Sequence, residues 1–341
     1  MKLVASALAV AALGLPAAHA SSAGLPGLVY TAGYGNSILT RFDPVTLERS
    51  GPRVRLGGNA SSWAYSPGRR YLAIAGFPQR LTVVEAGTMR VVSRIRLAPG
   101  GGVTHAVTWT RDDRVLAVVD TPGGAVVATV DPLAGRVIRR LRLPRPFGFQ
   151  FGRLPDGLVF LLGTRGSIAP VQVAIVDAQG RPVVVEVFQA TIGNGRLRSG
   201  GFEQQLPGLA VDPVGRRAYV VSGPRTFVVD LRTLEVSDPG PLRTLAKSVG
   251  GSIRSAHWLG GGVMAVSGAD YAASRRTPYG LRLVDVRNWT SRTIDPTADG
   301  FTVAGRLLLV EEPVGRRALL ATAYGFDGRG RHRLSSPARR G

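Results

Sequence analysis

The chain has 341 residues, of which 44% are hydrophobic, and it carries a formal net charge of +21. This length can bury a large hydrophobic core, and the absence of cysteine excludes a disulfide framework, a cysteine nucleophile and covalent haem attachment. The charge would attract anionic partners such as nucleic acid, cell-wall polymer or acidic lipid headgroups. However, Lys2 and Lys247 are the only lysines and the arginines are spread along the whole chain, which favours solvated positions that aid solubility.

The first 20 residues have the features of a secretory signal peptide. Lys2 precedes an apolar run from Leu3 to Leu15, and the small residues Ala18 and Ala20 provide a cleavage site. We therefore expect cleavage after Ala20 and a secreted or extracytoplasmic protein. No later segment has 18 consecutive apolar residues, so we expect no transmembrane segment. Residues 21–334 are then a single domain, followed by a polar, basic tail at 335–341.

An apolar strand followed by an acidic residue and a turn recurs seven times. Successive acidic residues are 42 to 55 residues apart, which is the period of a four-stranded propeller blade. They are Asp43, Glu85, Asp131, Asp177, Asp230, Asp285 and Asp327. We expect the aspartates to accept hydrogen bonds from the backbone of the turns they begin, and not to act in catalysis.

The second and third repeats show the strands of one unit most clearly. Short β-branched runs bounded by Gly, Pro and Asp predict antiparallel strands at 61–66, 71–76, 81–86 and 90–97, and again at 105–110, 115–120, 125–131 and 136–143. No helical periodicity follows the signal peptide. The sequence therefore predicts an all-β fold, a seven-bladed β-propeller with four-stranded antiparallel blades.

The two ends of the chain complicate closure of such a ring. The run at 28–33 has the character of a second strand, so the first blade lacks an inner strand unless the C-terminus supplies one. The polar tail after Leu334 is a poor candidate, so we expect imperfect closure between the seventh and first blades. The first turn of the seventh unit falls either at 313–318 or at Ala304-Gly305, and the sixth unit has Gly260-Gly261-Gly262 in place of a proline turn.

Two turn sequences recur with the strands: a D-P-x-T type between third and fourth strands, and S-P-x-G or D-P-x-G between first and second strands. This organisation resembles the YVTN-type propeller repeats of secreted bacterial proteins, which are relatives of the WD-repeat fold. The resemblance covers nearly all of residues 21–334. It implies a propeller repeat protein and no particular function.

Four longer segments, 163–170, 189–205, 237–252 and 268–279, interrupt the repeats. As connections between second and third strands or between blades, they should lie on one face of blades four to six, where a rigid scaffold presents binding groups. Guanidinium groups beside tyrosines suit a carboxylate, phosphate or sugar-acid ligand. The candidates are Arg165, Arg196, Arg198, Glu203, Lys247, Arg254, Asp270, Tyr271, Arg275, Arg276 and Tyr279. Arg139 and Arg140 should lie on a fourth strand, away from this face.

The sequence contains neither a G-x-S-x-G nucleophile motif nor a phosphate-binding loop. The histidines have no chelating spacing, so we expect no metal and no cofactor. His105 begins an inner strand and is a candidate for a ligand or general base in the central channel, although an ordinary hydrogen-bonded role is the favoured interpretation. Trp63, Trp109 and Trp258 recur on inner strands, where we expect them to pack between blades.

These observations favour a secreted, monomeric, non-enzymatic propeller that presents a binding face to a protein or an anionic extracellular polymer. The alternative is a secreted propeller hydrolase or lactonase with its site at the central channel. Propeller lactonases as a family place carboxylates around the channel, whereas the inner-strand starts here carry mostly Gly, Ser, Pro and Thr.

Overall fold

A computed structural model of the chain describes most of its residues and divides them into two compact units. The described residues are 9–11, 28–31, 38–42, 51–56, 58–100, 102–145, 147–164, 168–196, 202–222, 225–239, 253–270, 277–304, 307–314, 318–329 and 332–335. The first unit is Met1–Ala9 with Leu15–Gln189, and the second is Val10–Gly14 with Ala190–Gly341. The described residues have no helix long and apolar enough to cross a membrane.

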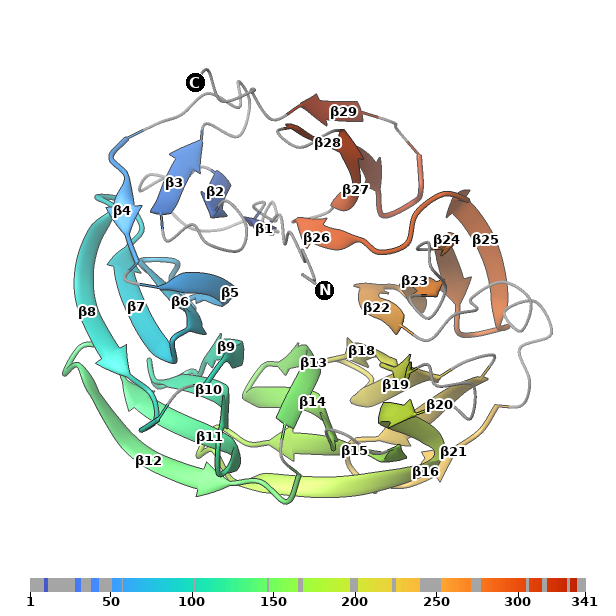
Figure 1. Cartoon of the computed structure of the whole chain (residues 1–341), viewed down its shortest axis with the longest axis horizontal. Coiled ribbons are helices and arrows are strands. Elements are labelled where there is room, and N and C mark those ends of the chain that lie inside the picture. Colours follow the sequence, from blue (N-terminus) through green and yellow to red (C-terminus); the bar gives the residue numbers. More distant parts are fainter. Residues whose placement is uncertain are drawn as a thin grey trace. The chain divides into compact units, whose positions relative to one another are not determined.

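The described strands form seven antiparallel sheets, numbered here in chain order (Figure 1). Sheet 1 contains β1 (Ala9–Ala11), β2 (Leu28–Thr31), β3 (Ile38–Phe42) and β4 (Val54–Arg55). Sheet 2 contains β5 (Asn59–Tyr65), β6 (Tyr71–Phe77), β7 (Arg80–Glu85) and β8 (Arg90–Arg96). Sheet 3 contains β9 (Thr104–Trp109), β10 (Val115–Thr121), β11 (Gly124–Asp131) and β12 (Arg136–Arg142).

Sheet 4 contains β13 (Phe147–Leu154), β14 (Gly157–Gly163), β15 (Ala169–Val176), β16 (Pro182–Arg196) and β17 (Phe202–Gln205). Sheet 5 contains β18 (Gly208–Asp212), β19 (Arg217–Ser222), β20 (Arg225–Asp230) and β21 (Val236–Ser237). Sheet 6 contains β22 (Ile253–Gly260), β23 (Val263–Asp270), β24 (Thr277–Asp285) and β25 (Thr290–Asp295). Sheet 7 contains β26 (Thr302–Ala304), β27 (Leu307–Val314), β28 (Ala318–Gly325) and β29 (His332–Ser335).

The predicted strands of the second and third repeats are confirmed to within two residues at each end. In both sheets the strands pair in chain order, each with the next, so Tyr65 faces Leu72 and Glu85 faces Arg90. The run of β-branched residues in β10 is buried throughout except at its last residue. The all-β, four-stranded antiparallel organisation that the sequence predicts is therefore present.

The core lies between neighbouring sheets, and the tryptophans help to form it. Trp109 of β9 stacks on Tyr71 of β6 with ring centroids 6.2 Å apart, and its indole N–H donates to the carbonyl of Ala64 at 2.8 Å. Trp63 packs with Leu39 and Ile74 in the cluster between sheets 1 and 2. In the second unit, Trp258 of β22 stacks on Tyr219 of β19. The prediction that these tryptophans pack between sheets is confirmed.

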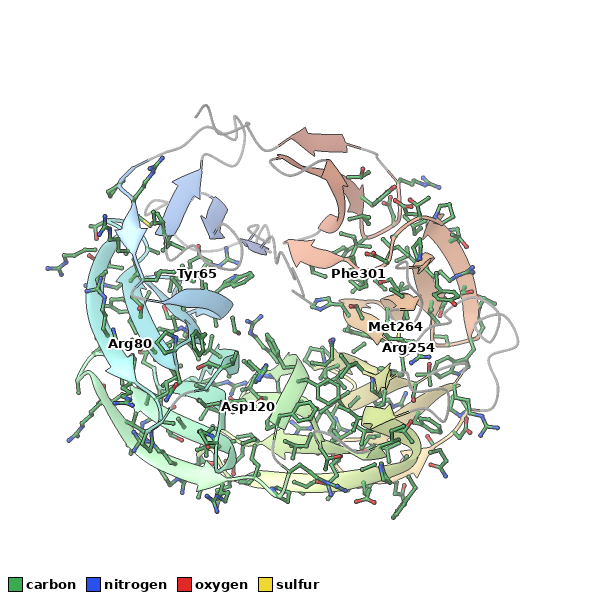
Figure 2. All side chains as sticks on the ribbon, viewed as in Figure 1. Tyr65, Arg80, Asp120, Arg254, Met264 and Phe301 are labelled. Carbon is green, nitrogen blue, oxygen red and sulfur yellow. The ribbon has the colours of Figure 1, made fainter. Side chains whose placement is uncertain are left out.

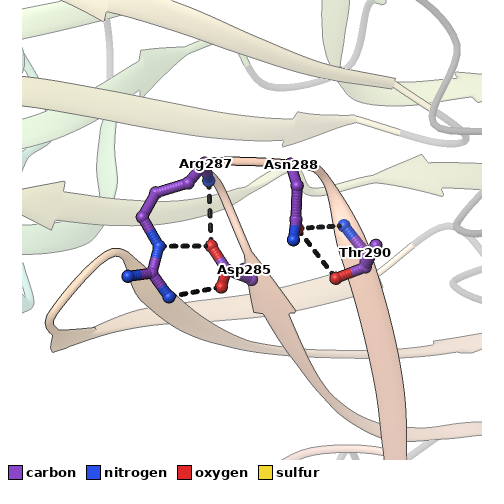
Figure 3. Close-up of polar contacts among 4 residues, drawn as sticks. All are labelled: Asp285, Arg287, Asn288 and Thr290. Carbon is purple, nitrogen blue, oxygen red and sulfur yellow. Dashed lines mark hydrogen bonds and ion pairs between the residues drawn. The ribbon is translucent and has the colours of Figure 1, made fainter.

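The recurrent aspartates form the turns between third and fourth strands, as predicted. Asp285 accepts hydrogen bonds from the backbone N–H of Arg287 and from its guanidinium, and Asn288 closes the same turn onto Thr290 (Figure 3). Four other aspartates accept an equivalent hydrogen bond from a backbone N–H of their turn. The donor is Ala134 for Asp131, Arg181 for Asp177, Arg232 for Asp230 and Arg329 for Asp327. Asp43 lies outside the described residues.

Two departures in the later repeats are resolved by strand pairing. In sheet 7, Ala304 pairs with Leu307, so the first turn falls at the earlier of the two predicted places and 313–318 belongs to the connection between β27 and β28. In sheet 6, Gly260, Gly261 and Gly262 all have positive φ, between 60° and 95°. Glycine adopts that region without the steric cost that a side chain would add, so the three glycines replace the proline turn.

Two segments are organised differently from the sequence interpretation. Within the segment 189–205, residues 189–196 and 202–205 form strands: β16 continues to Arg196 and pairs antiparallel with β17, with Gly193 opposite Gln205. Sheet 1 takes a fourth strand from Ala9–Ala11, within the segment interpreted as a signal peptide, and β29 is the edge strand of sheet 7. Cleavage after Ala20 would remove β1 and leave sheet 1 with three strands; cleavage itself stays a prediction.

Candidate functional site

The residues predicted for the long-loop face are only partly described. Arg165, Arg198, Lys247, Tyr271, Arg275 and Arg276 lie outside the described residues. The backbones of Arg196 and Glu203 belong to the hairpin of β16 and β17, where Arg196 pairs with Phe202 and Gly195 with Glu203.

Three of the predicted residues are brought to the same end of sheet 6. Arg254 of β22 pairs with Gly268 of β23, and Asp270 pairs with Thr277, two residues before Tyr279 on β24. Arg254 is only 8% exposed, and its backbone N–H donates to the carbonyl of Leu206. Its guanidinium therefore lies inside the sheet packing and not on a solvated loop.

His105, the channel candidate, belongs to a buried polar contact between sheets 3 and 4. Its Nε2 lies 2.7 Å from Oδ2 of Asp120, whose side chain is 4% exposed. The other carboxylate oxygen of Asp120, a residue labelled in Figure 2, accepts the backbone N–H of Gly148 on β13 at 3.0 Å. A Cβ at Gly148 would approach Val118 to 2.9 Å, so glycine permits the close approach. This geometry accounts for His105 as a hydrogen-bonded residue that helps to join two sheets.

A concave groove occurs elsewhere, between sheets 5 and 6 in the second unit. It has a volume of about 380 Å³, within the size range of ligand pockets. It lies at the end of the sheets that carries the short turns, opposite the end where the long loops are expected. Its lining residues are Arg217, Tyr219, Val228, Asp230, Glu235, Ser237, Val286 and Trp289.

The shortness of β21 contributes to this groove. The fourth strand has seven residues in sheets 2 and 3 but two in sheet 5, where Val228 pairs with Ser237 and Val229 with Val236. A Pro-Gly pair at 239–240 follows β21 in the sequence, and proline cannot donate to a β-ladder. Among the described residues, β20 therefore has a much shorter neighbouring fourth strand than the third strands of sheets 2 and 3 have.

Two aromatic rings, those of Tyr219 and Trp289, line the groove, and a third stacks on Tyr219. The rings of Tyr219 and Trp258 are nearly parallel, with centroids 5.3 Å apart and an interplanar angle of 6°. Trp289 meets Tyr219 edge-on at 6.2 Å and 67°. Burial raises the pKa of Tyr219, so its hydroxyl remains protonated at neutral pH. Trp289 is half-buried and presents part of its indole to the groove.

Charged groups of both signs surround this aromatic surface. Arg217 is exposed and pairs across the strands with Asp230. Asp230 accepts the backbone N–H groups of Arg232 at 2.8 Å and Thr233 at 3.1 Å, and these bonds lower the pKa of its carboxyl. Glu235 follows on the same turn, and its carbonyl accepts the N–H of Asp230. The groove thus offers an aromatic surface with a guanidinium and two carboxylates at its rim.

Sequence reasoning identified Asp230 only as a turn former and missed the remainder of the groove. Two signals were available in the sequence: the weak fourth strand of the fifth repeat, and the aromatic Trp289 in a turn where the third repeat has Gly135. Both Trp289 and Gly135 have positive φ, at 56° and 68°. A bulky residue with positive φ is unusual.

Among the described residues, no group of three or more His, Cys, Asp or Glu side chains is placed to hold a metal ion. The absence of a metal and of a cofactor stays a prediction for the chain as a whole. The groove's carboxylates lie in turn and rim positions, where they suit hydrogen bonding and ion pairing with a partner.

No protein-family model matches the sequence, and no curated protein matches it. Solved structures do match. BamB from Moraxella catarrhalis is 13% identical, with 96% of this chain and 87% of that chain covered and a TM-score of 0.54. The β-propeller domain of Cps50 (Swd1) from Myceliophteria thermophila is 15% identical, with 90% and 92% covered and a TM-score of 0.55. At such identities the likeness establishes the fold alone: the chain is a β-propeller.

Proposed function

We propose that this β-propeller is an exported, non-enzymatic protein that binds a protein partner through the groove between sheets 5 and 6. The observation that carries the proposal is the lining of this groove by Trp289, Tyr219 and Arg217. Tryptophan, tyrosine and arginine are the residue types most enriched among those that dominate binding energy in protein interfaces. Their apolar rings exclude water while the charged rim sets the orientation of a partner.

The same geometry argues against a hydrolase at this site. A general acid needs a carboxyl that is protonated near the working pH. Asp230 instead accepts two backbone N–H groups, which stabilise its ionised form and lower its pKa. Asp120, which does not line the groove, contacts His105 and accepts the backbone N–H of Gly148. Because the turn holds Asp230 in its ionised form, the proposed function of the groove is binding without chemistry.

Secretion, monomeric state and an anionic polymer as ligand of the loop arginines remain separate parts of the proposal. Secretion is supported by the composition of residues 1–20. N-terminal sequencing of exported material should start at or near Ser21, and material that retains Lys2 would contradict export by cleavage. The similarity to YVTN-type repeats agrees with an exported repeat protein but adds no ligand.

The binding proposal is tested by site-specific photo-cross-linking. A photoreactive residue at Ser237, on the rim of the groove, should capture a partner in intact cells of the source organism. The affinity of that partner, once purified, is then measured with the parent protein and with Trp289→Ala. Removing a central aromatic anchor typically costs 2 kcal/mol or more, so we expect binding at least about tenfold weaker.

The matched control is Phe188→Ala on β16, because Phe188 is an aromatic residue that is 70% exposed and does not line the groove. This variant should bind like the parent. Equal affinities of parent and Trp289→Ala, with both proteins folded by circular dichroism, would overturn the groove as the binding site. Loss of binding in both variants would indicate a broader or different interface.

A further inference from the structure

Two edge strands of the first unit carry seven arginines and no acidic residue. The strands are β8 and β12, the fourth strands of sheets 2 and 3, and nitrogen-tipped side chains project along them in Figure 2. The arginines are Arg90, Arg94, Arg96, Arg136, Arg139, Arg140 and Arg142, and all seven are exposed. We call this surface the basic wall.

Direct contacts make the basic wall one continuous surface. The hydroxyl of Ser93 on β8 donates to the carbonyl of Pro132, in the turn before β12, at 2.7 Å. In the other direction, Nε of Arg140 on β12 donates to the carbonyl of Leu97, just after β8, at 2.7 Å. Arginines that are scattered in the sequence are therefore concentrated in space.

The guanidinium groups are held in place without being neutralised. Four of the guanidinium groups each donate a hydrogen bond to a backbone carbonyl. The acceptors are the carbonyls of Arg55 for Arg94, Ala98 for Arg96, Gln179 for Arg139 and Leu97 for Arg140. A backbone carbonyl orients a guanidinium but leaves its full positive charge, and the remaining N–H groups can still donate to an anion. Glu85 and Asp131 lie opposite Arg90 and Arg136 at one end only.

Protection of a sheet edge does not explain so many like charges. Edge strands often carry a charged residue that prevents pairing with another chain. However, the edge strand β25 carries one arginine and one aspartate, and the edge strand β29 carries one histidine and one arginine. Sheets of the same protein are thus protected with far fewer charges, which leaves the excess on β8 and β12 to be explained by an anionic partner.

Exposed aliphatic side chains among the arginines favour a lipid surface as that partner. Leu133, in the turn before β12, is 54% exposed and Ile138 on β12 is 46% exposed. Thr129 of β11 pairs with Arg139 of β12, and the next residue, Val130, pairs with Val137. Ile138, which lies between these two partners, is therefore the extra residue of a β-bulge. Bulges re-aim side chains. Apolar side chains beside basic ones suit the boundary between anionic headgroups and acyl chains.

We propose that the basic wall docks the protein on a bilayer surface that contains anionic phospholipid. The arginines bind headgroup phosphates, and Leu133 and Ile138 enter the acyl boundary. Arginine is suited to phosphate because its planar N–H groups match two oxygens at once. Each basic residue near an anionic membrane strengthens binding about fivefold. The wall as a whole can therefore hold the protein at the surface, while the groove in the second unit carries a separate function.

The test is co-sedimentation of the full-length protein with phosphatidylcholine vesicles, with and without phosphatidylglycerol. The wall variant is Arg90→Gln, Arg136→Gln and Arg142→Gln, which leaves the four carbonyl-bonded arginines in place. The matched control removes the same charge from three exposed arginines on separate turns: Arg69→Gln, Arg232→Gln and Arg329→Gln. We expect the wall variant to bind anionic vesicles roughly 10- to 100-fold more weakly than the parent and the control variant to change several-fold less. Equal losses in both variants would overturn the proposal in favour of a diffuse field from the whole protein.

A second variant distinguishes a lipid surface from a soluble polyanion. Leu133→Asn with Ile138→Thr keeps every arginine and removes the exposed aliphatic groups. It should lose several-fold in binding to anionic vesicles and bind soluble polyphosphate like the parent. Unchanged vesicle binding by this variant would overturn the lipid proposal. The proposal would also fail if the parent bound vesicles of phosphatidylcholine alone as strongly as vesicles that also contain phosphatidylglycerol.

Discussion

The fourth strands of sheets 3 and 5 differ much more than the second strands of the same sheets. In the first unit, β12 has seven residues, four of them arginine, and presents a positive surface. In the second unit, β21 has two residues and leaves a groove lined by Trp289, Tyr219 and Arg217. Yet β10 and β19, the second strands of the same sheets, are both buried along their centres. The first three strands are constrained by packing, whereas the fourth faces solvent and can diverge into different surfaces.

The comparison predicts that both units depend on the same packing of tryptophan against the preceding sheet. Replacement of Trp109 or of Trp258 by Ala removes a ring stacked on Tyr71 or Tyr219, respectively. Each should reduce the free energy of unfolding by about 3–5 kcal/mol, measured by urea denaturation. A large loss in one variant and a negligible loss in the other would break the equivalence of the two units.

Each unit also contains a buried aspartate whose loss should be the next most costly change. Asp120 joins β10 to Gly148, and Asp295 accepts the hydroxyl of Tyr324 at 2.8 Å and the N–H of Thr297 at 2.9 Å. Asp120→Ala and Asp295→Ala each leave buried donors without an acceptor, which costs about 1–3 kcal/mol or more. Thermal unfolding would measure the loss of stability in each variant. A variant as stable as the parent would show that its aspartate does not stabilise the fold.

The turns of the second unit predict a dependence of stability on pH. The guanidinium and backbone N–H of Arg287 lower the pKa of Asp285 to about 2 from an ordinary value of 3.8. The folded state therefore binds fewer protons than the unfolded state in this window. The contribution of Asp285 is fully present above about pH 4 and is lost as pH falls toward 2. Denaturation between pH 5 and pH 2 should show a flatter profile for Asp285→Asn than for the parent.

The smallest predicted effect sharpens the comparison at the turn between first and second strands. Arg69 in the first unit and Arg216 in the second have positive φ, at 56° and 52°. A residue with a side chain destabilises the folded state by about 1 kcal/mol in this backbone conformation. Glycine avoids that cost but loses more conformational entropy on folding, which offsets part of the gain. Arg69→Gly and Arg216→Gly should each raise the free energy of unfolding by roughly 0.5 kcal/mol. A decrease in either variant would mean that the arginine makes a compensating contact.

The fold could be predicted in detail from the sequence because its signals are local. The strand ends, the aspartate turns and the inter-sheet tryptophans each depend on neighbouring residues, and the sheets have them where they were expected. The extension of β16 through Gly193 was missed, because glycine and asparagine ordinarily indicate a turn. The pairing of Ala9–Ala11 with sheet 1 could not be expected from a segment with the composition of a signal peptide.

The candidate surfaces were far less predictable because they depend on which sheets become neighbours. The sequence assigned the arginines to scattered solvated positions and placed Arg139 and Arg140 away from the long-loop face. The contacts between β8 and β12 instead bring them into a basic surface of seven arginines. The groove was missed for the same reason, since Tyr219 and Trp289 are 70 residues apart in the sequence and meet only across two sheets.

The central claim is that the fourth strands of the two units carry two independent binding surfaces. The most direct measurement is vesicle co-sedimentation of the wall variant and of Trp289→Ala in parallel, with the purified groove partner added to each. The account predicts that Trp289→Ala binds anionic vesicles like the parent but fails to bring the partner to them. The wall variant should bind the partner normally in solution and sediment poorly with vesicles. Loss of vesicle binding by Trp289→Ala, or normal sedimentation of the wall variant, would contradict the account.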